Sequence, residues 1–161
     1  RGGEEALALH SAGIRFEVVP GLTTAVAAPT LAGIPLTHRG LASSFVVVSG
    51  LNEASFQPIL HSLPVGKLTV IVLMGLARRA AIAACLLEQG WPGETPAAIV
   101  FSSSTPSAHA WTGRLEDLGR VPCQAGANAP GTIIIGKVVD LRTVFGTSQD
   151  NASSTVLEGK S

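Results

Sequence analysis

Residues with special chemistry recur directly after several apolar runs of this sequence. Two adjacent threonines, Thr23 and Thr24, follow a proline-glycine turn, and the chain's only methionine, Met74, ends the run LTVIVLM. A serine-rich loop that includes Ser103 follows the run AAIVF, and the turn NAPGT precedes the run TIIIG. Ligands of α/β proteins bind at the carboxyl ends of strands, where loops expose backbone donors and acceptors. Each feature alone is typical of a turn, a helix cap or core packing, but their repetition at successive strand ends predicts one shared cleft.

Histidines and serines supply candidate bases and nucleophiles, but no recognisable catalytic motif joins them. His10, His38, His61 and His109 are spread along the chain without a GxSxG turn or an obvious acidic partner. The sequence also lacks the HExxH zinc motif, the phosphate-binding P-loop and the dinucleotide-binding GxGxxG pattern. Residue types therefore give no support to a serine hydrolase, to an HExxH metalloenzyme or to either of these nucleotide-binding loops.

The pair His38 and Arg39 is the stronger polar candidate. A guanidinium group can hold a carboxylate through two parallel hydrogen bonds, and Gly33 and Pro35 restrict the loop before the pair. An exposed loop with a structural salt bridge would contain the same residue types. On residue types alone, both interpretations stay open.

The composition is that of a folded domain without a strongly charged partner. The chain has 161 residues, of which 46% are hydrophobic and 14% are charged, so one domain with a sizeable core is expected. Basic and acidic residues balance at 11 each, which predicts no nucleic-acid or membrane partner. No apolar run approaches the roughly 20 residues needed to cross a bilayer. Cys85 and Cys123 lack zinc-binding spacing and are interpreted as reduced thiols of a cytoplasmic protein.

Sequence patterns predict helices that alternate with strands. The segment 54–66 is expected to form a helical turn or a short helix interrupted by Pro58 and Pro64. The continuous apolar runs at 43–50 and 67–75 are typical of strands buried on both faces. The further predicted helices cover residues 4–13, 24–33, 77–90, 114–119 and 140–145, and the further predicted strands cover residues 16–19, 97–104, 109–113 and 132–139. This order predicts an α/β fold with a mixed sheet flanked by helices.

The two ends of the chain carry separate expectations. Residues 146–161 are polar and aperiodic, which predicts a disordered tail. The sequence begins with Arg1 instead of methionine and shows no signal-peptide pattern. We therefore expect it to be a piece of a longer protein.

Several segments, in one order, resemble the tetrapyrrole methylase family. They are RGGEE, VVPGLTTAVAAPTLAGIPLTHRG, VLMGL, TPAAIVFSSSTP, WTGRLEDL and PGTIIIGKVV, and they extend from Arg1 to about Phe145. The segment AGIPLTHRGLASSF is the most specific of the matching stretches. It looks like the corresponding part of the uroporphyrinogen-III C-methyltransferases, which also form a module of siroheme synthases.

The resemblance implies a methyltransferase of siroheme and cobalamin biosynthesis. S-adenosyl-L-methionine would be the methyl donor and uroporphyrinogen III the acceptor, with methylation at C2 and then C7 to give precorrin-2. Proteins of this family have two α/β domains with the cofactor in the cleft between them, and they are typically homodimers. By this resemblance, residues 1–13 would be the end of the first domain and residues 14–145 the C-terminal tetrapyrrole methylase domain.

The first domain of the family supplies parts that this chain lacks. These parts are a proline-glycine cofactor loop, a GGDP motif and the acid and base groups proposed for proton transfer. The resemblance therefore implies no catalytic residue within this chain. We expect the 161 residues to be inactive on their own.

The resemblance also implies cofactor contacts at matching positions. Thr23 and Thr24 would contact the methionine part of the cofactor, and Met74 would lie against it. Ser103 occupies a position that makes a backbone contact and is often Gly or Ala in the family.

Two more pairs of residues receive roles from the same comparison. Pro130 and Gly131 would border the adenine side of the cofactor. His38 and Arg39 are predicted to face the acidic side chains of the tetrapyrrole, because a positive group there would complement the carboxylates.

Two other functions remain open at this point. Another precorrin methylase of the same family would share the cofactor cleft and act on a different acceptor. A non-catalytic binding module would keep the fold without transferring methyl groups. Intact GGDP and proline-glycine loops upstream of this chain would favour an enzyme.

Overall fold

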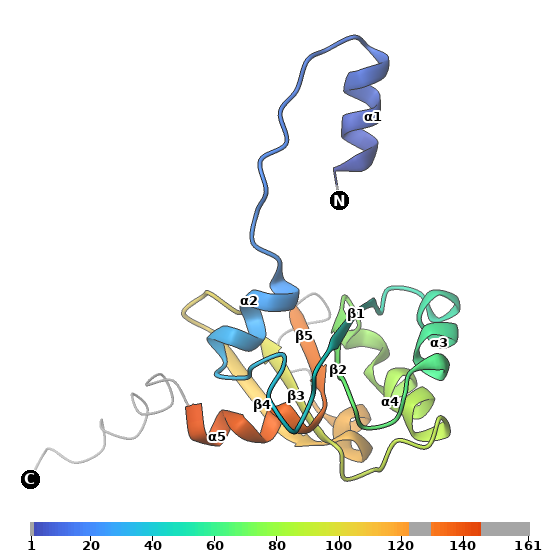
Figure 1. The fold of residues 1–161 in the computed structure, drawn as a ribbon, viewed down its shortest axis with the longest axis vertical. Coiled ribbons are helices and arrows are strands. Elements are labelled where there is room, and N and C mark those ends of the chain that lie inside the picture. The colour runs from blue at the N-terminus through green and yellow to red at the C-terminus, as the bar shows by residue number, and fades with distance from the viewer. Residues whose placement is uncertain (1, 123–129, 146–161) are drawn as a thin grey trace, which may run out of the picture.

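A five-stranded mixed sheet with helices on both faces forms the body of the protein (Figure 1). The computed structural model describes residues 2–122 and 130–145. The architecture confirms the predicted α/β fold class. The predicted tail at 146–161 and the thiol of Cys123 lie outside the described residues.

The elements follow one another in an order close to the predicted one. The helices are α1 (Gly3–Ser11), α2 (Thr24–Leu31), α3 (Glu53–Ser62), α4 (Arg79–Glu88) and α5 (Arg142–Phe145), and the 3-10 helices are η1 (Leu76–Arg78), η2 (Leu115–Arg120) and η3 (Lys137–Leu141). The strands are β1 (Phe45–Ser49), β2 (Thr69–Leu73), β3 (Pro96–Phe101), β4 (His109–Arg114) and β5 (Gly131–Ile135).

The strand order across the sheet is β1-β2-β5-β3-β4. β1 and β2 are parallel, whereas β5 lies between β2 and β3 and is antiparallel to both. β1, β2 and β3 therefore have their carboxyl ends at one edge of the sheet, and β5 begins at that same edge. Loops from four separate parts of the chain meet there.

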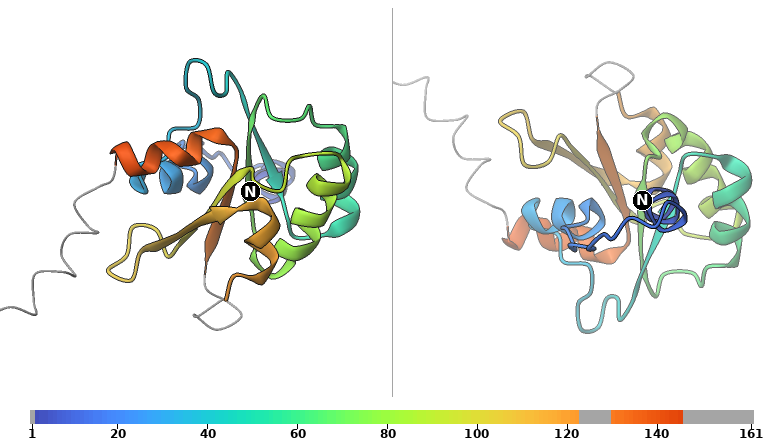
Figure 2. Two further views of the ribbon diagram at one scale, coloured as in Figure 1. Left: turned by 90° about the horizontal axis from the view of Figure 1, so that it is seen from below. Right: turned by 90° about the horizontal axis from the view of Figure 1, so that it is seen from above.

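The two faces of the sheet pack against different helices (Figure 2). On one face, β2, β3 and β5 pack against α3, α4 and η2, in a cluster that contains Ile99, Phe56 and Ile82. The opposite face packs against α2 and η3, in a cluster that contains Val100 and Ala28. Burial on both faces explains why the central strands are continuous apolar runs.

Helix α4 buries the face that its sequence predicts. Ile82, Cys85 and Leu86 are all buried, and the helix ends close to the predicted glycine stop. Burial raises the pKa of the Cys85 thiol, and the nearby carboxylates of Glu88 and Glu53 raise it further. The thiol therefore stays protonated at neutral pH and acts as a small apolar group in the core.

Helix α3 runs through Pro58 without a break, so the predicted interruption there is wrong. The Asn52 side chain caps the helix by accepting a hydrogen bond from the backbone N–H of Ala54 at 3.0 Å. Phe56 is fully buried and anchors the helix to the sheet. This cap and the tertiary packing together offset the hydrogen bond that proline cannot donate. The helix ends just before Pro64.

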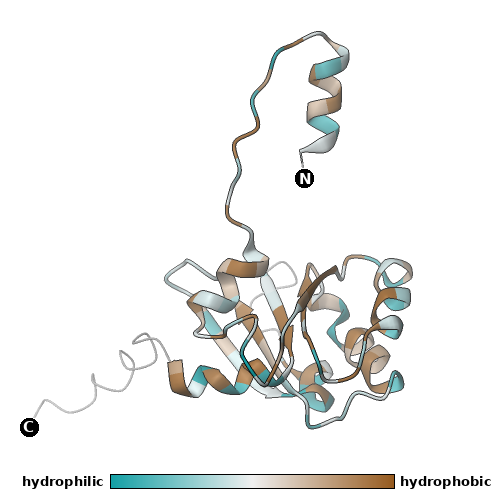
Figure 3. Ribbon diagram, viewed as in Figure 1, coloured by the Kyte–Doolittle hydropathy of each residue, from teal (hydrophilic) through white to brown (hydrophobic). Residues whose placement is uncertain are grey.

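Residues 16–19 do not form the predicted strand. They lie in an extended segment in which Val19 is 80% exposed, and no strand within the described ranges pairs with them. A strand needs a neighbour to satisfy its backbone N–H and C=O groups. Helix α1 precedes this segment and lies away from the sheet. Hydrophobic residues occur at intervals along the segment that connects α1 to α2 (Figure 3). None of residues 2–24 is buried, so the tertiary packing begins within α2.

β1 is an edge strand with one open face, which corrects the expectation that it is buried on both. Phe45 is 44% exposed and Val47 is 43% exposed, whereas Val48 on the other face is buried. β1 lies at the end of the sheet, and α2 packs over β2 and β5. The apolar run was long enough for a buried strand, but its position in the sheet leaves one face uncovered.

β5 ends at Ile135, four residues before the predicted end at 139. The backbone of Gly136 has φ 144°, a conformation that favours glycine, and it turns the chain out of the sheet. Residues 137–141 then form η3. In the two described stretches, no helix is both long and apolar enough to cross a membrane.

Gly50 and Gly75 bring two loops into direct backbone contact beside the ends of β1 and β2. A β-carbon on Gly50 would overlap the Cα of Gly75 and would lie 2.9 Å from Cγ1 of Val72. The backbone N–H of Gly50 donates to the carbonyl of Leu73 at 2.7 Å, which holds the loops together. These distances leave no room for a side chain at position 50.

We predict that Gly50→Ala lowers the free energy of unfolding by about 1–3 kcal/mol, because the added methyl group must push two backbones apart. Urea unfolding of the 161-residue chain, followed by circular dichroism, measures the effect. Gly3→Ala is the matched control, because a β-carbon at Gly3 has no neighbour within 4 Å. An unfolding midpoint of Gly50→Ala equal to that of the control would show that the loops can separate at no cost.

Candidate functional site

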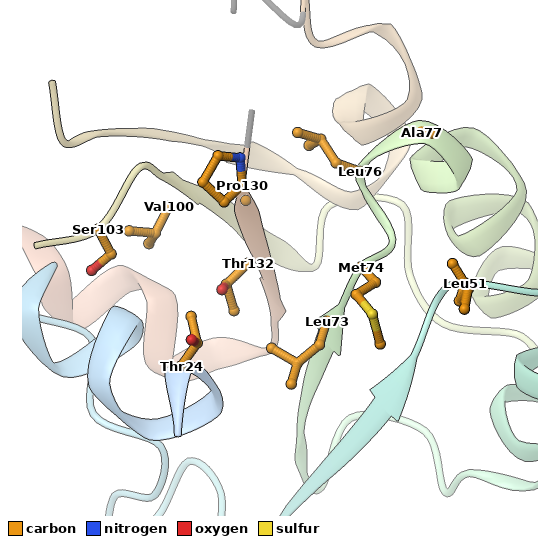
Figure 4. A pocket seen from close by; sticks show the side chains of 11 residues that line it. Thr24, Leu51, Leu73, Met74, Leu76, Ala77, Val100, Ser103, Pro130 and Thr132 are labelled. Atoms are coloured by element: carbon orange, nitrogen blue, oxygen red, sulfur yellow. The ribbon is translucent and has the colours of Figure 1, made fainter. Parts of the chain in front are cut away.

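A cavity of about 640 Å³ opens at the edge of the sheet where β1, β2 and β3 end (Figure 4). Its size lies within the usual range for a small-molecule site. Of the residues predicted to form a shared cleft, it brings together Thr24, Met74, Ser103, Pro130 and Gly131. These residues come from four parts of the chain, so the prediction of one shared cleft agrees with the fold.

Met74 occupies a strained backbone conformation directly after β2. Its φ is 56°, in the left-handed backbone region that residues other than glycine rarely adopt. Ser102 and Ser104, which follow β3, have φ of 47° and 65°. Such conformations cost on the order of 1–3 kcal/mol each and cluster at functional sites. All the non-glycine residues with positive φ in the described stretches therefore lie in the two loops that border the cavity.

The apolar part of the cavity wall is formed by side chains from the loops after β1 and β2. Leu51 directly follows Gly50, and Met74, which is 53% exposed, directly precedes Gly75. Leu73 and Leu76 continue this apolar wall (Figure 4). The close approach of the two glycines places the loops, and the loops place the wall.

The beginning of β5 is held against the end of β3 by a backbone hydrogen bond. The N–H of Ser102 donates to the carbonyl of Pro130 at 2.9 Å, which brings the serine loop and the proline-glycine turn to the same wall. A β-carbon on Gly131 would lie 3.1 Å from Cδ2 of Leu76. Glycine at this position therefore lets Leu76 pack closely against β5.

Arg79 fixes the loop that carries Leu76, a role that sequence reasoning missed. Its Nη1 donates to the carbonyl of Leu76 at 3.0 Å, and its Nε donates to the carbonyl of Val121 at 3.0 Å. A detectable signal was present in the sequence. A cation at the first residue of a helix is disfavoured by the helix dipole, so Arg79 needs a partner outside the helix.

Hydroxyl groups form the other part of the wall. Thr24, Ser103 and Thr132 lie on the side of the cavity away from Leu51 and Leu76 (Figure 4). Thr132 is only 2% exposed, and it was not among the predicted site residues. The sequence signal for it was one hydroxyl at the start of the otherwise apolar run TIII.

Thr23 lies outside the cavity wall and caps helix α2. Its side chain accepts a hydrogen bond from the backbone N–H of Ala25 at 3.3 Å. This cap fixes the helix terminus that presents Thr24 to the cavity. A contact between Thr23 and a cofactor stays a prediction.

His38 and Arg39 lie in an exposed turn before β1 and do not line the cavity. The backbone N–H of His38 donates to the carbonyl of Ala42 at 2.9 Å, which closes the turn. A role of this pair in binding an acceptor stays a prediction. Across the described stretches, no group of three or more His, Cys, Asp or Glu side chains could hold a metal ion.

Comparison with known proteins identifies relatives with the same fold. Residues 1–119 match the family model of tetrapyrrole (corrin/porphyrin) methylases. Siroheme synthase of Thiobacillus denitrificans is 40% identical over 143 residues, which cover 88% of this chain and 30% of the relative. Siroheme synthase of Escherichia coli is 42% identical over 142 residues, which cover 88% of this chain and 31% of the relative. The chain thus spans about a third of these curated relatives.

Solved structures give the same result. Uroporphyrin-III C-methyltransferase of Thermus thermophilus, complexed with S-adenosyl homocysteine, is 39% identical with a TM-score of 0.71. The match covers 88% of this chain and 61% of that enzyme. Another structure of the Thermus enzyme is 43% identical with a TM-score of 0.74, and the match covers 90% of this chain and 61% of that enzyme. A cobalt precorrin-4 methyltransferase shares the fold at 19% identity and a TM-score of 0.73, covering 86% of this chain and 59% of that chain. With the family model matching most of its length, this chain belongs to the tetrapyrrole methylase family.

Proposed function

We propose that the chain forms one wall of the cofactor site of an S-adenosyl-L-methionine-dependent uroporphyrinogen-III C-methyltransferase. The observation that carries the proposal is the cavity at the carboxyl edge of the sheet, which collects Thr24, Met74, Ser103, Pro130 and Gly131. The Thermus relative, at 39% identity, was crystallised with S-adenosyl homocysteine, the demethylated form of that cofactor.

The wall suits the cofactor in both size and chemistry. A cavity of about 640 Å³ can hold a ligand of this size, and the hydroxyl of Thr132 borders it without a protein hydrogen-bond partner within the described residues. Met74 and Leu76 offer apolar surface, while Thr24 and Ser103 offer hydroxyl groups. S-adenosyl-L-methionine has an aromatic base and polar groups at both ends, and both parts of the wall would meet complementary chemistry.

When bound, the cofactor supplies a methyl group that its positive sulfur already activates for transfer. The protein's main task is then to orient the donor and the acceptor, because alignment alone can contribute several kcal/mol to such a reaction. The strained loops at Met74 and Ser102 and the glycine contact at Gly50 hold the wall in one geometry. In this proposal the chain binds and orients the cofactor, and the groups that move protons lie elsewhere in the protein.

The finer assignments follow from the same proposal. The acceptor is uroporphyrinogen III, methylated at C2 and C7 to give precorrin-2 in the cytoplasm. Residues 1–13 belong to the first domain and residues 14–145 to the second, a division consistent with helix α1 having no buried residue. The matched methyltransferases use a longer chain, of which this sequence covers 61%, so the 161 residues alone are expected to transfer no methyl groups.

The whole protein is proposed to be a homodimer. Exposed apolar side chains on β1 and on the segment before α2, such as Phe45 at 44% and Val19 at 80%, support a covered surface in the assembled protein. Sedimentation equilibrium of the product of the full natural reading frame is expected to give the mass of two chains. A single-chain mass at micromolar concentration would contradict the proposal.

The activity is tested with the full natural reading frame that contains these residues. Incubation with labelled S-adenosyl-L-methionine and uroporphyrinogen III is expected to place two labelled methyl groups on each acceptor. Binding of S-adenosyl homocysteine without transfer to this acceptor would favour another precorrin methylase. Neither binding nor transfer by the folded protein would favour a non-catalytic module and reject the proposed function.

Arg39→Ala tests the predicted acceptor contact in the same reading frame. Loss of one charge-assisted hydrogen bond to a carboxylate, worth about 1.5–3 kcal/mol, predicts a KM for uroporphyrinogen III about tenfold higher or more. The KM for S-adenosyl-L-methionine should not change, because Arg39 does not line the cavity. Arg39→Lys is the control that keeps the charge. Unchanged acceptor KM in Arg39→Ala would remove Arg39 from the site.

A further inference from the structure

We infer that the hydroxyl of Thr132 is a hydrogen-bonding group for the ligand of the cavity, a role that neither the sequence motifs nor the family comparison assigns. The inference rests on the proposed cofactor function and adds a residue to it. Thr132 is the second residue of β5 and lies opposite Val100 in the register. Its side chain stands between Thr24 and Pro130 at the cavity (Figure 4).

The burial of Thr132 makes an unpartnered hydroxyl there unusual. The residue is 2% exposed, and within the described residues its side chain has no hydrogen-bond partner in the protein. Buried hydroxyl groups nearly always have a partner, because leaving one unsatisfied costs free energy. Thr95, for comparison, is 8% exposed and donates to the carbonyl of Pro92 at 2.6 Å. The hydroxyl of Thr132 borders the cavity and is open to it, so a ligand bound there can supply its hydrogen-bond partner.

Thr69 offers an instructive contrast on the neighbouring strand. It is fully buried, and its Oγ1 is enclosed by protein without a hydrogen-bond partner. It begins β2, at the end of that strand away from the cavity, and does not contribute to the cavity wall. The Oγ1 of Thr132, unlike that of Thr69, is not enclosed by protein atoms. Two buried threonines on adjacent strands thus differ in whether a ligand can reach the hydroxyl.

The chemistry of the site gives the hydroxyl a selective role. Met74 and Leu76 lie on the other side of the cavity, where their side chains make only apolar contacts (Figure 4). A threonine hydroxyl can both donate and accept a hydrogen bond, so it matches the ring nitrogens, sugar hydroxyls or amino-acid end of S-adenosyl-L-methionine. A valine at position 132 would keep the shape and remove this pairing. A ligand with polar atoms on one side would then lose affinity.

The test measures binding of S-adenosyl homocysteine by isothermal titration calorimetry, using the product of the full natural reading frame. Thr132→Val is expected to weaken binding about threefold to tenfold, the effect of losing one neutral hydrogen bond. Thr69→Val is the matched control, because it makes the same chemical change in a buried strand residue that the cavity does not include. Its affinity should equal that of the wild type.

A second pair of variants isolates the hydroxyl if Thr132→Val folds poorly. Thr132→Ser keeps the hydroxyl and Thr132→Ala removes it, while both lose the methyl group. We expect the serine variant to bind severalfold more tightly than the alanine variant. Thermal unfolding of every variant shows whether the folded fraction is comparable.

The possible outcomes separate this inference from the function on which it rests. If the wild type binds and Thr132→Val binds with the same affinity, the role of Thr132 is overturned and the cofactor site stays intact. Equal affinities of the serine and alanine variants would have the same meaning. The same loss of affinity in Thr69→Val would also overturn it, because the effect would then come from the fold. Failure of the folded wild type to bind S-adenosyl homocysteine overturns the proposed function and this inference together.

Discussion

β5 pairs with both β2 and β3, and the position of the cavity depends on this pairing. Because β5 is antiparallel to both neighbours, it begins at the edge where they end. The hydrogen bond from the Ser102 N–H to the Pro130 carbonyl, at 2.9 Å, joins the two chain segments at that edge. A parallel β5 would place Pro130 and Gly131 at the opposite edge, away from Met74 and Ser103. The direction of one central strand therefore assembles the site.

The loops at this edge are held by close backbone packing. A β-carbon on Gly50 would overlap the backbone of Gly75, and one on Gly75 would crowd the side chains of Val72 and Ile82. Met74, between β2 and Gly75, adopts a left-handed conformation. Strained residues persist only where the surrounding structure determines them strongly. Here the surroundings include the 2.7 Å hydrogen bond from Gly50 to Leu73 and the contacts of Arg79. A wall that is ordered before binding loses little conformational entropy when a ligand arrives.

The wall combines two kinds of surface, and this division limits what it can bind. Leucine and methionine side chains line one part, and the hydroxyls of Thr24, Ser103 and Thr132 line another. A ligand with both a flat apolar part and several polar atoms satisfies both. S-adenosyl-L-methionine has this character, and membership of the tetrapyrrole methylase family makes it the natural candidate. In the proposed function, the main task of the wall is to hold such a ligand in one orientation.

Local patterns determined much of the fold and part of the site. The apolar runs predicted β2, β3 and the start of β5, the Ile82–Cys85–Leu86 face predicted the buried side of α4, and the residues after the strands predicted a cleft. These predictions succeeded because strand burial and helix faces depend on nearby residues. Pro58 was misjudged, since packing of Phe56 and the Asn52 cap outweigh the lost hydrogen bond.

Other features depended on neighbours distant in the sequence. Residues 16–19 have a strand-like pattern but no pairing strand in the described part of the chain, and β1 has an apolar sequence but an edge position. In the sequence, Thr132 is a single hydroxyl residue at the start of an apolar run. In the structure, it lies on β5 and lines the cavity. The sequence by itself indicated the segments that form the five strands, together with residues 16–19 that do not, and it showed which loops carry unusual residues. Only the tertiary structure decided which of those residues meet, because strand order and direction arise from long-range pairing that no local pattern encodes.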